Sequence, residues 1–374
     1  LADFGAPVIK IDPPPAGDGS RTFALRAPTP TSDVNYTWQM DKRHARSLAL
    51  NLKTEEGRKV LRQLVAECDV YVTNTPHPMR REWGLTYEEL ATLNSSLIYA
   101  SLTAYGELGP ERDREGFDLV AYWARSGLMD LVRAPGADPA PAIPGMGDHP
   151  TAVSLYAAIL TALFKRQQTG EGSHVHTSLL ANGMWSASCI AQGVFAEADF
   201  TLYHQLSSHL FTRLLYEAAD GRWLQFSMVR TDEEVDMLFT AIGRPDLLLD
   251  PRFVTADLRV EHGNVLVEEM KAALITETAA HWMQVLTDVG VPVALVGRVD
   301  ELTSDPQVIA NDMAITPTPE VGMPSVINHP LNIEGLATRS AGRAPDLGEH
   351  SEAILAELGY TATDIARAKE QGVI

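Results

Sequence analysis

The sequence predicts an α/β protein with a larger domain built on a parallel β-sheet and a smaller α+β domain. In the first half, short apolar runs such as Val8–Ile11 and Asp69–Thr73 alternate with amphipathic helical segments, which is typical of right-handed βαβ units. From about residue 200 the pattern changes, because Asp220-Gly221 between two β-rich runs indicates a hairpin. The length of 374 residues also exceeds that of one typical domain.

The helices and strands of the first half follow from local signals. Thr54 is a suitable N-cap, and Leu61 and Val65 then place an apolar stripe on one face of a helix. Further elements are expected as strands at Leu97–Thr103 and Ser173–Ser178 and as helices at Tyr87–Leu93 and Leu179–Phe195. In a parallel sheet, ligands lie beyond the carboxyl ends of the strands, which places Asn74 and Thr75 on the ligand side.

A Pro- and Gly-rich loop at residues 134–147 leads into Asp148, His149 and Pro150 and a long apolar segment that reaches Phe164. Because this segment is apolar on nearly all faces, we expect a buried helix. Pro150 suits its first turn, with Asp148 or His149 at or just before the N-cap. A carboxylate there would face orphan backbone N–H groups, so we expect these donors to lower the pKa of Asp148.

The second half predicts the smaller α+β domain and a helical C-terminus. Helices are expected at Glu233–Ile242, Leu258–Leu274 and Ala279–Val289, and a strand at Val291–Val296. After a Pro-rich segment at residues 317–330, two further helices are expected near Glu349–Leu358 and Ala362–Gln371.

The charge balance excludes several classes of partner. With 49 acidic and 30 basic residues, the formal net charge is −19, whereas nucleic acid and anionic membranes attract positively charged surfaces. No apolar run of about 18 residues predicts a transmembrane helix, and two cysteines are too few for a disulfide framework or a structural zinc site. The opening residues lack a signal-peptide pattern, so we expect a cytoplasmic protein without membrane or nucleic-acid partners.

Spacing alone leaves both a structural and a functional interpretation open for each candidate site residue. Asp148 is more typical of a plain N-cap than of an active carboxylate, although the two glycines before it would let a ligand approach the backbone. His174 and His176 share one face of a strand but lack a third ligand nearby, so their metal signal is weak. The basic residues at 42–46 and 80–81 form either solvated surface or a phosphate-binding patch.

Several motifs in a common order resemble those of the class III CoA-transferases, also described as the CaiB/BaiF type. They are Gly5–Ile11 with Gly17-Asp18, Arg46–Gly57, Asn74–Leu85, Gly147-Asp148, Arg166 with Thr169–Gly172, and Leu347–His350 with Leu355–Tyr360. The similarity covers essentially the whole chain. This family includes formyl-CoA transferase, crotonobetainyl-CoA:carnitine CoA-transferase and α-methylacyl-CoA racemase.

The resemblance implies a Rossmann-like large domain, a small domain, and an interlocked homodimer in which each chain forms a ring threaded by the other. On this basis we expect a large CoA-binding domain over residues 1–198, a linker and small domain over 199–325, and a C-terminal return to the large domain over 326–374. The family's opening strand and its glycine-containing loop have no counterpart before Leu1, so we expect that a segment precedes this chain.

The resemblance also implies a site. The family's nucleophilic aspartate matches Asp148, which would exchange an acyl-CoA donor with a carboxylic acid acceptor through an aspartyl-CoA thioester. The residues that match CoA-contacting or site-lining positions are Leu50, Asn51, Lys53, Asn74, Thr75, Arg81 and Asp118. Arg81 enters this set because Glu82 stands where some relatives have arginine. Coenzyme A is expected as part of the substrate, and no metal is expected.

Two alternatives stay open within this resemblance, a racemase and a CoA-transferase fused to a second activity such as a lyase. The racemase branch uses a histidine in a Gly-His-Asp motif, whereas this chain has Gly116-Phe117-Asp118. Phenylalanine cannot exchange a proton, so CoA transfer is favoured. Pro13 and Ala45 depart from an arginine of formyl-CoA transferase and a usual lysine of the family, which leaves the acyl donor and the acceptor acid open.

Overall fold

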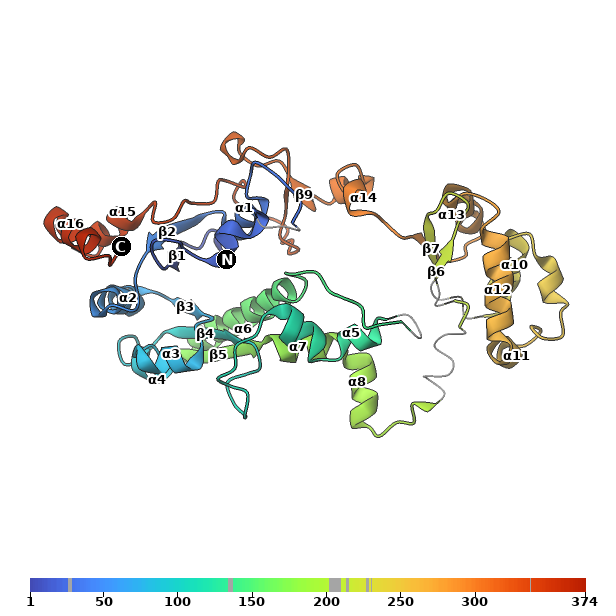
Figure 1. The fold of residues 1–374 in the computed structure, drawn as a ribbon, viewed down its shortest axis with the longest axis horizontal. Helices are drawn as coiled ribbons and strands as arrows, with labels where there is room; N and C mark the ends of the chain where they lie inside the picture. Colours follow the sequence, from blue (N-terminus) through green and yellow to red (C-terminus); the bar gives the residue numbers. More distant parts are fainter. Residues whose placement is uncertain are drawn as a thin grey trace. The chain divides into compact units, whose positions relative to one another are not determined.

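The computed structural model describes residues 1–25, 29–133, 137–201, 210–212, 215–226, 229, 231–336 and 338–374. The chain divides into two compact units (Figure 1). Unit 1 comprises Leu1–Leu131, Pro141–Ala187 and Thr303–Ile374, and unit 2 comprises Val132–Ala140 and Ser188–Leu302. The domain boundaries that the sequence suggests at residues 198 and 325 stay a prediction.

Unit 1 contains two parallel sheets. In one, β1 (Val8–Asp12) pairs with β2 (Ala45–Ala49). In the other, β3 (Val70–Thr73), β4 (Ile98–Thr103) and β5 (Ser173–Ser178) lie in that order, with Val70 opposite Ile98 and Ile98 opposite Ser173. The predicted parallel pairing is therefore confirmed. A mixed α/β fold results, in which helices connect parallel strands.

The first long helix between these strands begins where its capping residue predicts. The α2 helix (Glu55–Glu67) starts after Thr54, whose hydroxyl accepts a hydrogen bond from the Gly57 N–H at 3.1 Å. The short helices α3 (His77–Glu82) and α4 (Tyr87–Leu90) lie between β3 and β4. An N-cap of this kind satisfies one of the backbone N–H groups that a helix leaves unpaired at its start.

Several elements of unit 1 had no clear sequence signal. They are the 3-10 helices η1 (Ala2–Phe4), η2 (Gly19–Leu25) and η6 (Pro319–Val321), the helices α1 (Tyr36–Lys42), α5 (Leu128–Leu131) and α14 (Pro306–Ala310), the π-helix η3 (Leu119–Ala124), and the strands β9 (Ala314–Ile315) and β10 (Val326–Ile327). Most are only one or two turns long, which is too short for a hydrophobic period to show.

The long helix α6 (Asp148–Thr169) packs along β4 and β5 (Figure 1). Its buried residues are Thr151, Leu155, Ile159 and Ala162. The prediction of a helix buried on all faces is wrong for the single chain, because Phe164 is 64% exposed and Leu160 is 42% exposed. The sheet covers one face of α6, whereas Leu160 and Phe164 lie on exposed parts of the helix.

The C-terminal segment belongs to unit 1. The helices α15 (Ser351–Glu357) and α16 (Ala362–Glu370) contribute Ile354, Leu355 and Ile365 to the same buried cluster as Leu48 of β2. The Val373 carbonyl also accepts a hydrogen bond from the Asn51 N–H at 2.8 Å. These contacts fix the segment after β2 against the end of the chain.

Unit 2 has a three-stranded antiparallel sheet covered by helices. The strands β6 (Leu215–Glu217) and β7 (Trp223–Phe226) form the hairpin predicted at Asp220-Gly221, and β8 (Val293–Leu295) pairs with β7. The helical elements are α8 (Ser188–Phe195), α10 (Asp232–Ala241), η4 (Pro245–Leu248), α11 (Ala256–Glu261), α12 (Gly263–Leu274), α13 (Ala279–Asp288) and η5 (Val299–Glu301). The expected helix from Leu179 to Phe195 is interrupted at Ala187, so α7 (Leu179–Ser186) and α8 are separate.

A helix that crosses a membrane must be both long and apolar. Among the helices within the described ranges, none combines the length and the apolar character that a membrane crossing requires.

Gly172, in the connection between α6 and β5, provides a test of the packing of this connection against the segment that precedes β4. A Cβ atom at this position would lie 2.3 Å from the Leu97 carbonyl oxygen and 2.7 Å from the Leu97 nitrogen. Because backbone atoms cannot move aside as a flexible side chain can, Gly172→Ala should lower the free energy of unfolding by about 1–3 kcal/mol or more. Urea denaturation followed by circular dichroism measures this change.

Gly19→Ala is the matched control, because a Cβ at Gly19 meets no atom within 4 Å. Its stability should stay within about 0.5 kcal/mol of wild type. Equal stability of the two variants would contradict the described packing.

Candidate functional site

Asp148 is the first residue of α6, immediately after the N-cap Gly147. Glycine has no side chain to cap the helix, and the structure shows no side-chain cap at this end. The prediction that Asp148 or His149 lies at or just before the N-cap is wrong, because the N-cap Gly147 precedes both residues. The Asp148 side chain is exposed. The carboxylate is therefore accessible instead of being consumed as a cap.

The expected lowering of the pKa of Asp148 is wrong. Partial burial by the surrounding loop and helices raises the pKa of Asp148, and the negative charges of Asp118 and Asp41 raise it further. His149 acts in the opposite direction. The helix N-terminus favours the ionised form of Asp148, but the structure also places the carboxylates of Asp118 and Asp41 near it. Like charges disfavour ionisation.

Asp118 holds the loop that precedes Asp148. Its side chain is only 3% exposed. One carboxylate oxygen, Oδ2, accepts hydrogen bonds from the N–H groups of Gly145 at 2.7 Å and Gly147 at 3.1 Å, and Oδ1 accepts one from Leu119 at 2.9 Å. Hydrogen bonds to an ionised carboxylate are stronger than those between neutral groups. The contacts of Asp118 thus tie the start of η3 to the start of α6.

The two glycines of this loop are required for different reasons. Gly145 has φ of 91°, in the left-handed region that favours glycine. Gly147 is packed so closely that a Cβ would lie 2.7 Å from Cγ of Tyr122 and 2.9 Å from Cβ of Asp118. Gly145 is therefore needed for its backbone conformation, and Gly147 is needed because no side chain fits there.

Polar contacts also fix the first turns of α6. The Thr151 hydroxyl donates to the Gly147 carbonyl at 2.7 Å. The Ser154 hydroxyl donates to Oδ1 of Asn182 at 2.5 Å, and Nδ2 of Asn182 donates to the Thr177 hydroxyl at 2.8 Å. Ser154 thus joins the start of α6 to α7, and Asn182 in turn joins α7 to β5.

The residues after β2 lie in a second group. Leu50 is 1% exposed and belongs to the hydrophobic core, so its side chain is unavailable to a ligand. The Asn51 amide donates to the Gly372 carbonyl at 3.2 Å, and its Oδ1 accepts from the Lys53 N–H at 3.2 Å. Lys53 is exposed. Of the three residues predicted here, Lys53 therefore offers the most accessible side chain.

The residues after β3 form a third group. Asn74 is exposed, and the Thr75 N–H donates to the Thr73 hydroxyl at 3.1 Å. Arg81 on α3 is 46% exposed and pairs with Asp113 at 3.1 Å. Surface ion pairs contribute little to stability, so a phosphate group can compete for this guanidinium. Among the hydrogen bonds and ion pairs described, those of Asn74, Thr75 and Arg81 do not reach Asp118 or Asp148.

A buried polar network centred on Glu107 connects α3 to β4 and β5, and no local sequence pattern predicts it. Glu107 Oε2 lies 2.6 Å from Nε2 of His77, and its Oε1 lies 3.2 Å from Arg80. The Ser101 hydroxyl donates to Glu107 at 2.6 Å and lies 2.9 Å from Nε2 of His174. The network occupies Arg80 and His174, so neither is a free phosphate or metal ligand.

The basic residues at 42–46 are largely engaged in ion pairs. Arg43 is 7% exposed and pairs with Asp3, and Arg46 pairs with Glu357 at 2.8 Å. Within the described ranges, no group of three or more His, Cys, Asp or Glu side chains is arranged to hold a metal ion.

Phe117 is 83% exposed. It stands where the racemase branch has a histidine. Its exposure beside Asp118, in the segment that supports the Asp148 loop, places a large apolar ring on the surface next to the candidate site.

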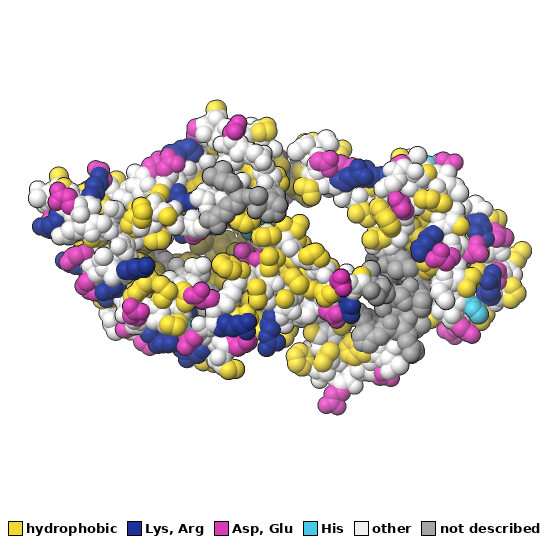
Figure 2. All heavy atoms as spheres, in the orientation of Figure 1, with side chains coloured by type: hydrophobic (Ala, Val, Ile, Leu, Met, Phe, Trp, Pro, Cys, Tyr) yellow, Lys and Arg dark blue, Asp and Glu magenta, His cyan; other side chains and the backbone are white. Residues whose placement is uncertain are grey.

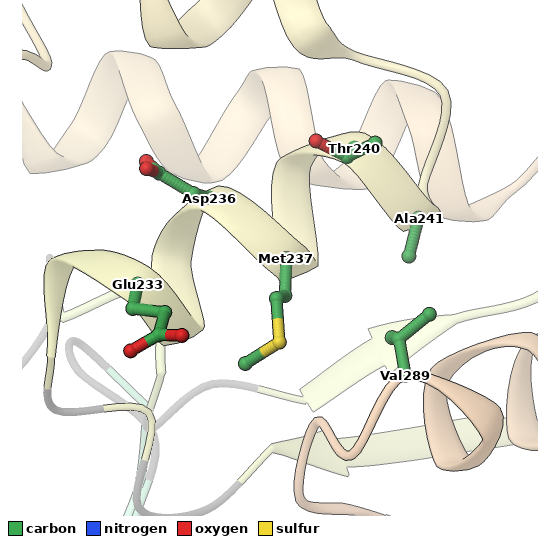
Figure 3. A pocket seen from close by; sticks show the side chains of 6 residues that line it. All are labelled: Glu233, Asp236, Met237, Thr240, Ala241 and Val289. Carbon is green, nitrogen blue, oxygen red and sulfur yellow. The ribbon is translucent and has the colours of Figure 1, made fainter.

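An open hollow of about 320 Å³ lies in unit 2, between α10 and the end of α13 (Figure 3). It is lined by Glu233, Asp236, Met237, Thr240, Ala241 and Val289. Figure 3 shows the side chains of Glu233 and Met237 on the same side of the helix, with Val289 on a neighbouring segment. Two acidic side chains on its rim do not suit a ligand that carries phosphates, and none of the predicted site residues lines it.

Comparison with known proteins identifies the class to which this fold and site belong. The model of CoA-transferase family III matches residues 1–351. An (R)-2-hydroxy-4-methylpentanoate CoA-transferase of Clostridioides difficile is 30% identical over 100% of this chain and 94% of its own length. A cinnamoyl-CoA:phenyllactate CoA-transferase of Clostridium sporogenes is 30% identical over 98% of this chain and 90% of its own length.

A solved structure gives the same result. A CaiB/BaiF family protein from Brucella suis superimposes with a TM-score of 0.81 at 28% identity, covering 95% of this chain and 93% of the other. The chain belongs to CoA-transferase family III. It is a CoA-transferase, an enzyme whose substrates are CoA thioesters.

The direction of the Asp148 shift gives a testable expectation. In a ¹³C NMR titration of the carboxyl groups, the pKa of Asp148 should lie above the ordinary aspartate value of about 3.9, because burial and Asp118 disfavour the ionised form. Loss of the signal in Asp148→Asn assigns it. Asp250 is the internal control, since hydrogen bonds from Arg252 lower the pKa of Asp250 to about 2. A midpoint for Asp148 at or below the ordinary value would contradict the described surroundings.

Proposed function

We propose that this enzyme moves CoA from an acyl-CoA donor to a carboxylic acid acceptor through an aspartyl-CoA thioester on Asp148. The observation that supports this most strongly is the presentation of Asp148. Asp148 is exposed at the start of α6. The buried carboxylate of Asp118 accepts two hydrogen bonds from the loop in front of it and so holds that loop. An accessible carboxylate on a fixed backbone is suited to nucleophilic catalysis.

In the first half of the reaction, an Asp148 carboxylate oxygen attacks the thioester carbonyl of the donor. The C–S bond breaks, which gives a mixed anhydride and CoA thiolate. The thiolate then attacks the Asp148 carbonyl of this anhydride, so that the donor acid leaves as a carboxylate. The enzyme now carries CoA as an aspartyl thioester.

In the second half, the acceptor carboxylate attacks the aspartyl thioester and releases CoA thiolate. The thiolate attacks the acceptor carbonyl of the resulting anhydride, which gives the new acyl-CoA and restores the Asp148 carboxylate. Because the nucleophile must be ionised, its active fraction falls as the pH decreases through the raised pKa of Asp148.

CoA itself is proposed to bind through the residues after β2 and β3. Lys53 and Arg81 supply exposed positive charge for phosphates, and Asn51, Asn74 and Thr75 supply polar groups. Leu50 would contribute through its backbone only, since its side chain is buried. Both carboxylate oxygens of Asp118 are engaged by backbone N–H groups, so we assign it to positioning the Asp148 loop instead of contacting CoA.

An interlocked homodimer is proposed from the apolar surface of unit 1. Exposed apolar residues on α6 and α7 are Val153, Leu160, Phe164, Met184 and Trp185. Figure 2 shows hydrophobic side chains gathered over this part of the molecule. Contiguous exposed apolar patches mark interaction surfaces in soluble proteins. A second copy of the chain would cover them.

The racemase alternative has less support. An acid/base pair for α-proton exchange needs a second titratable group where this chain has Phe117, which cannot carry a proton. A fused second activity and a cytoplasmic location stay predictions.

Trapping the covalent intermediate tests the function. With an acyl-CoA donor present, hydroxylamine should convert Asp148 to a hydroxamate that peptide mass spectrometry locates. Asp148→Asn should lower the rate of CoA transfer by roughly 10³-fold or more, as loss of a covalent nucleophile does in other enzymes. The assay uses acetyl-CoA and succinyl-CoA as donors and includes 2-hydroxy-4-methylpentanoate and phenyllactate among the acceptors.

The matched control is Asp257→Asn, which changes another exposed aspartate in the first turn of a helix. Its rate should equal that of wild type. An unmodified Asp148 in an enzyme that still transfers CoA would overturn the proposal.

Phe164→Glu tests the dimer. Burying a carboxylate in an apolar interface is unfavourable, so sedimentation velocity should show at least about a tenfold smaller ratio of dimer to monomer than in wild type. Gln167→Glu, on an exposed position of the same helix, is the control for added charge. A monomeric wild type at micromolar concentration would contradict the dimer.

A further inference from the structure

His149 lies next to the nucleophile and is held by a residue from another helix. Its Nε2 is 3.3 Å from Oδ1 of Asp41 on α1. Its ring packs over Gly145, with Cε1 3.5 Å and Nδ1 3.7 Å from the position that a Cβ of Gly145 would take. The ring is thus fixed on one side by the loop before Asp148 and at one nitrogen by Asp41.

The ionisable groups that face His149 are all acidic. They are Asp41 on α1, Asp148 beside it on α6, and Asp118 at the start of η3. The hydrogen bond to Asp41 raises the pKa of His149, and the other two carboxylates raise it further. Around the Asp148 carboxylate, His149 is therefore the group that supplies positive charge.

The chemistry of the proposed reaction makes this charge useful. The acceptor acid arrives as a carboxylate, in a region that already contains three aspartates and in a chain of net charge −19. An anion that approaches Asp148 is repelled unless a cation faces it. With Nε2 bonded to Asp41, an imidazolium has Nδ1–H left to donate.

We propose that His149 binds the carboxylate of the acceptor acid beside Asp148, and that Asp41 is a positioning residue that keeps His149 oriented and protonated. This inference rests on the proposed function, because it assigns the acid-binding group of that same site. The binding is strongest below the raised pKa of His149 and is lost as the pH increases through it.

If the pair of His149 and Asp41 had only a structural role, loss of the pair would lower the melting temperature. The His149 side chain is 56% exposed and that of Asp41 is 35% exposed. Exposed pairs contribute little to stability. His149→Gln should therefore leave the melting temperature unchanged, so that a kinetic effect can be assigned to substrate binding.

The kinetic test separates the acceptor from the donor. In His149→Gln, the KM for the acceptor acid should increase by about tenfold or more, as expected for loss of a hydrogen bond between charged groups. The KM for acetyl-CoA and the single-turnover rate of hydroxylamine trapping should change by less than about twofold, because no free carboxylate enters before thioester formation. His281→Gln, at an exposed histidine in unit 2, is the control.

The pH dependence tests the role of Asp41. In Asp41→Asn, the pKa of His149 should fall, because the hydrogen bond from its ring N–H to a carboxylate is lost. The increase in acceptor KM should then begin at a lower pH than in wild type. A ¹H NMR titration of the His149 ring, assigned by its absence in His149→Gln, follows both the pKa and the shift that added acetate or oxalate causes.

The outcomes are distinct. An equal change in donor and acceptor KM, or no change in either, overturns the inference while leaving Asp148 chemistry intact. An unmodified Asp148 overturns the proposed function instead. A His149 signal that neither acetate nor oxalate shifts overturns the inference whether or not the enzyme turns over with the acids assayed.

Discussion

The carboxylate of Asp118 is the interaction on which the arrangement of this site depends. It is buried and accepts three backbone N–H groups, two of them from the glycines in front of Asp148. An ionised group with so little exposure is tolerated only when hydrogen bonds replace its lost hydration. Those same bonds fix a loop that contains no capping side chain of its own, so one buried charge both stabilises the loop and orients Asp148, the proposed nucleophile.

The elements around α6 hold the start of this helix in place. The helix α6 rests on β4 and β5, and polar contacts of Thr151 and Ser154 anchor its first turns. Asp118 also raises the pKa of Asp148. A carboxylate whose ionised form is destabilised has a higher affinity for an acyl group as well as for a proton, which suits a nucleophile that must hold an anhydride and then a thioester.

Local chemistry made part of this predictable. Thr54 caps α2, Asp220-Gly221 forms the hairpin, and the apolar runs around Val70 and Ile98 pair in parallel. The pKa of Asp148 was predicted in the wrong direction because its neighbours Asp118 and Asp41 are distant in sequence. The burial of α6 was overestimated because a sequence does not distinguish a face covered by its own chain from one left for a partner. The network around Glu107 joins four separate segments and has no local signature.

The central claim is that Asp118 presents Asp148 for covalent chemistry, and one measurement tests it directly. In Asp118→Asn, one of the N–H groups now bonded to the carboxylate would face an amide N–H₂, so the loop before Asp148 should shift. The single-turnover rate of aspartyl-CoA thioester formation, measured by rapid-quench mass spectrometry, should fall by about 10²-fold, with acyl-CoA affinity near that of wild type. The melting temperature should be lower than that of wild type, because a buried N–H group loses its acceptor. Thioester formation at the wild-type rate in this variant would contradict the account.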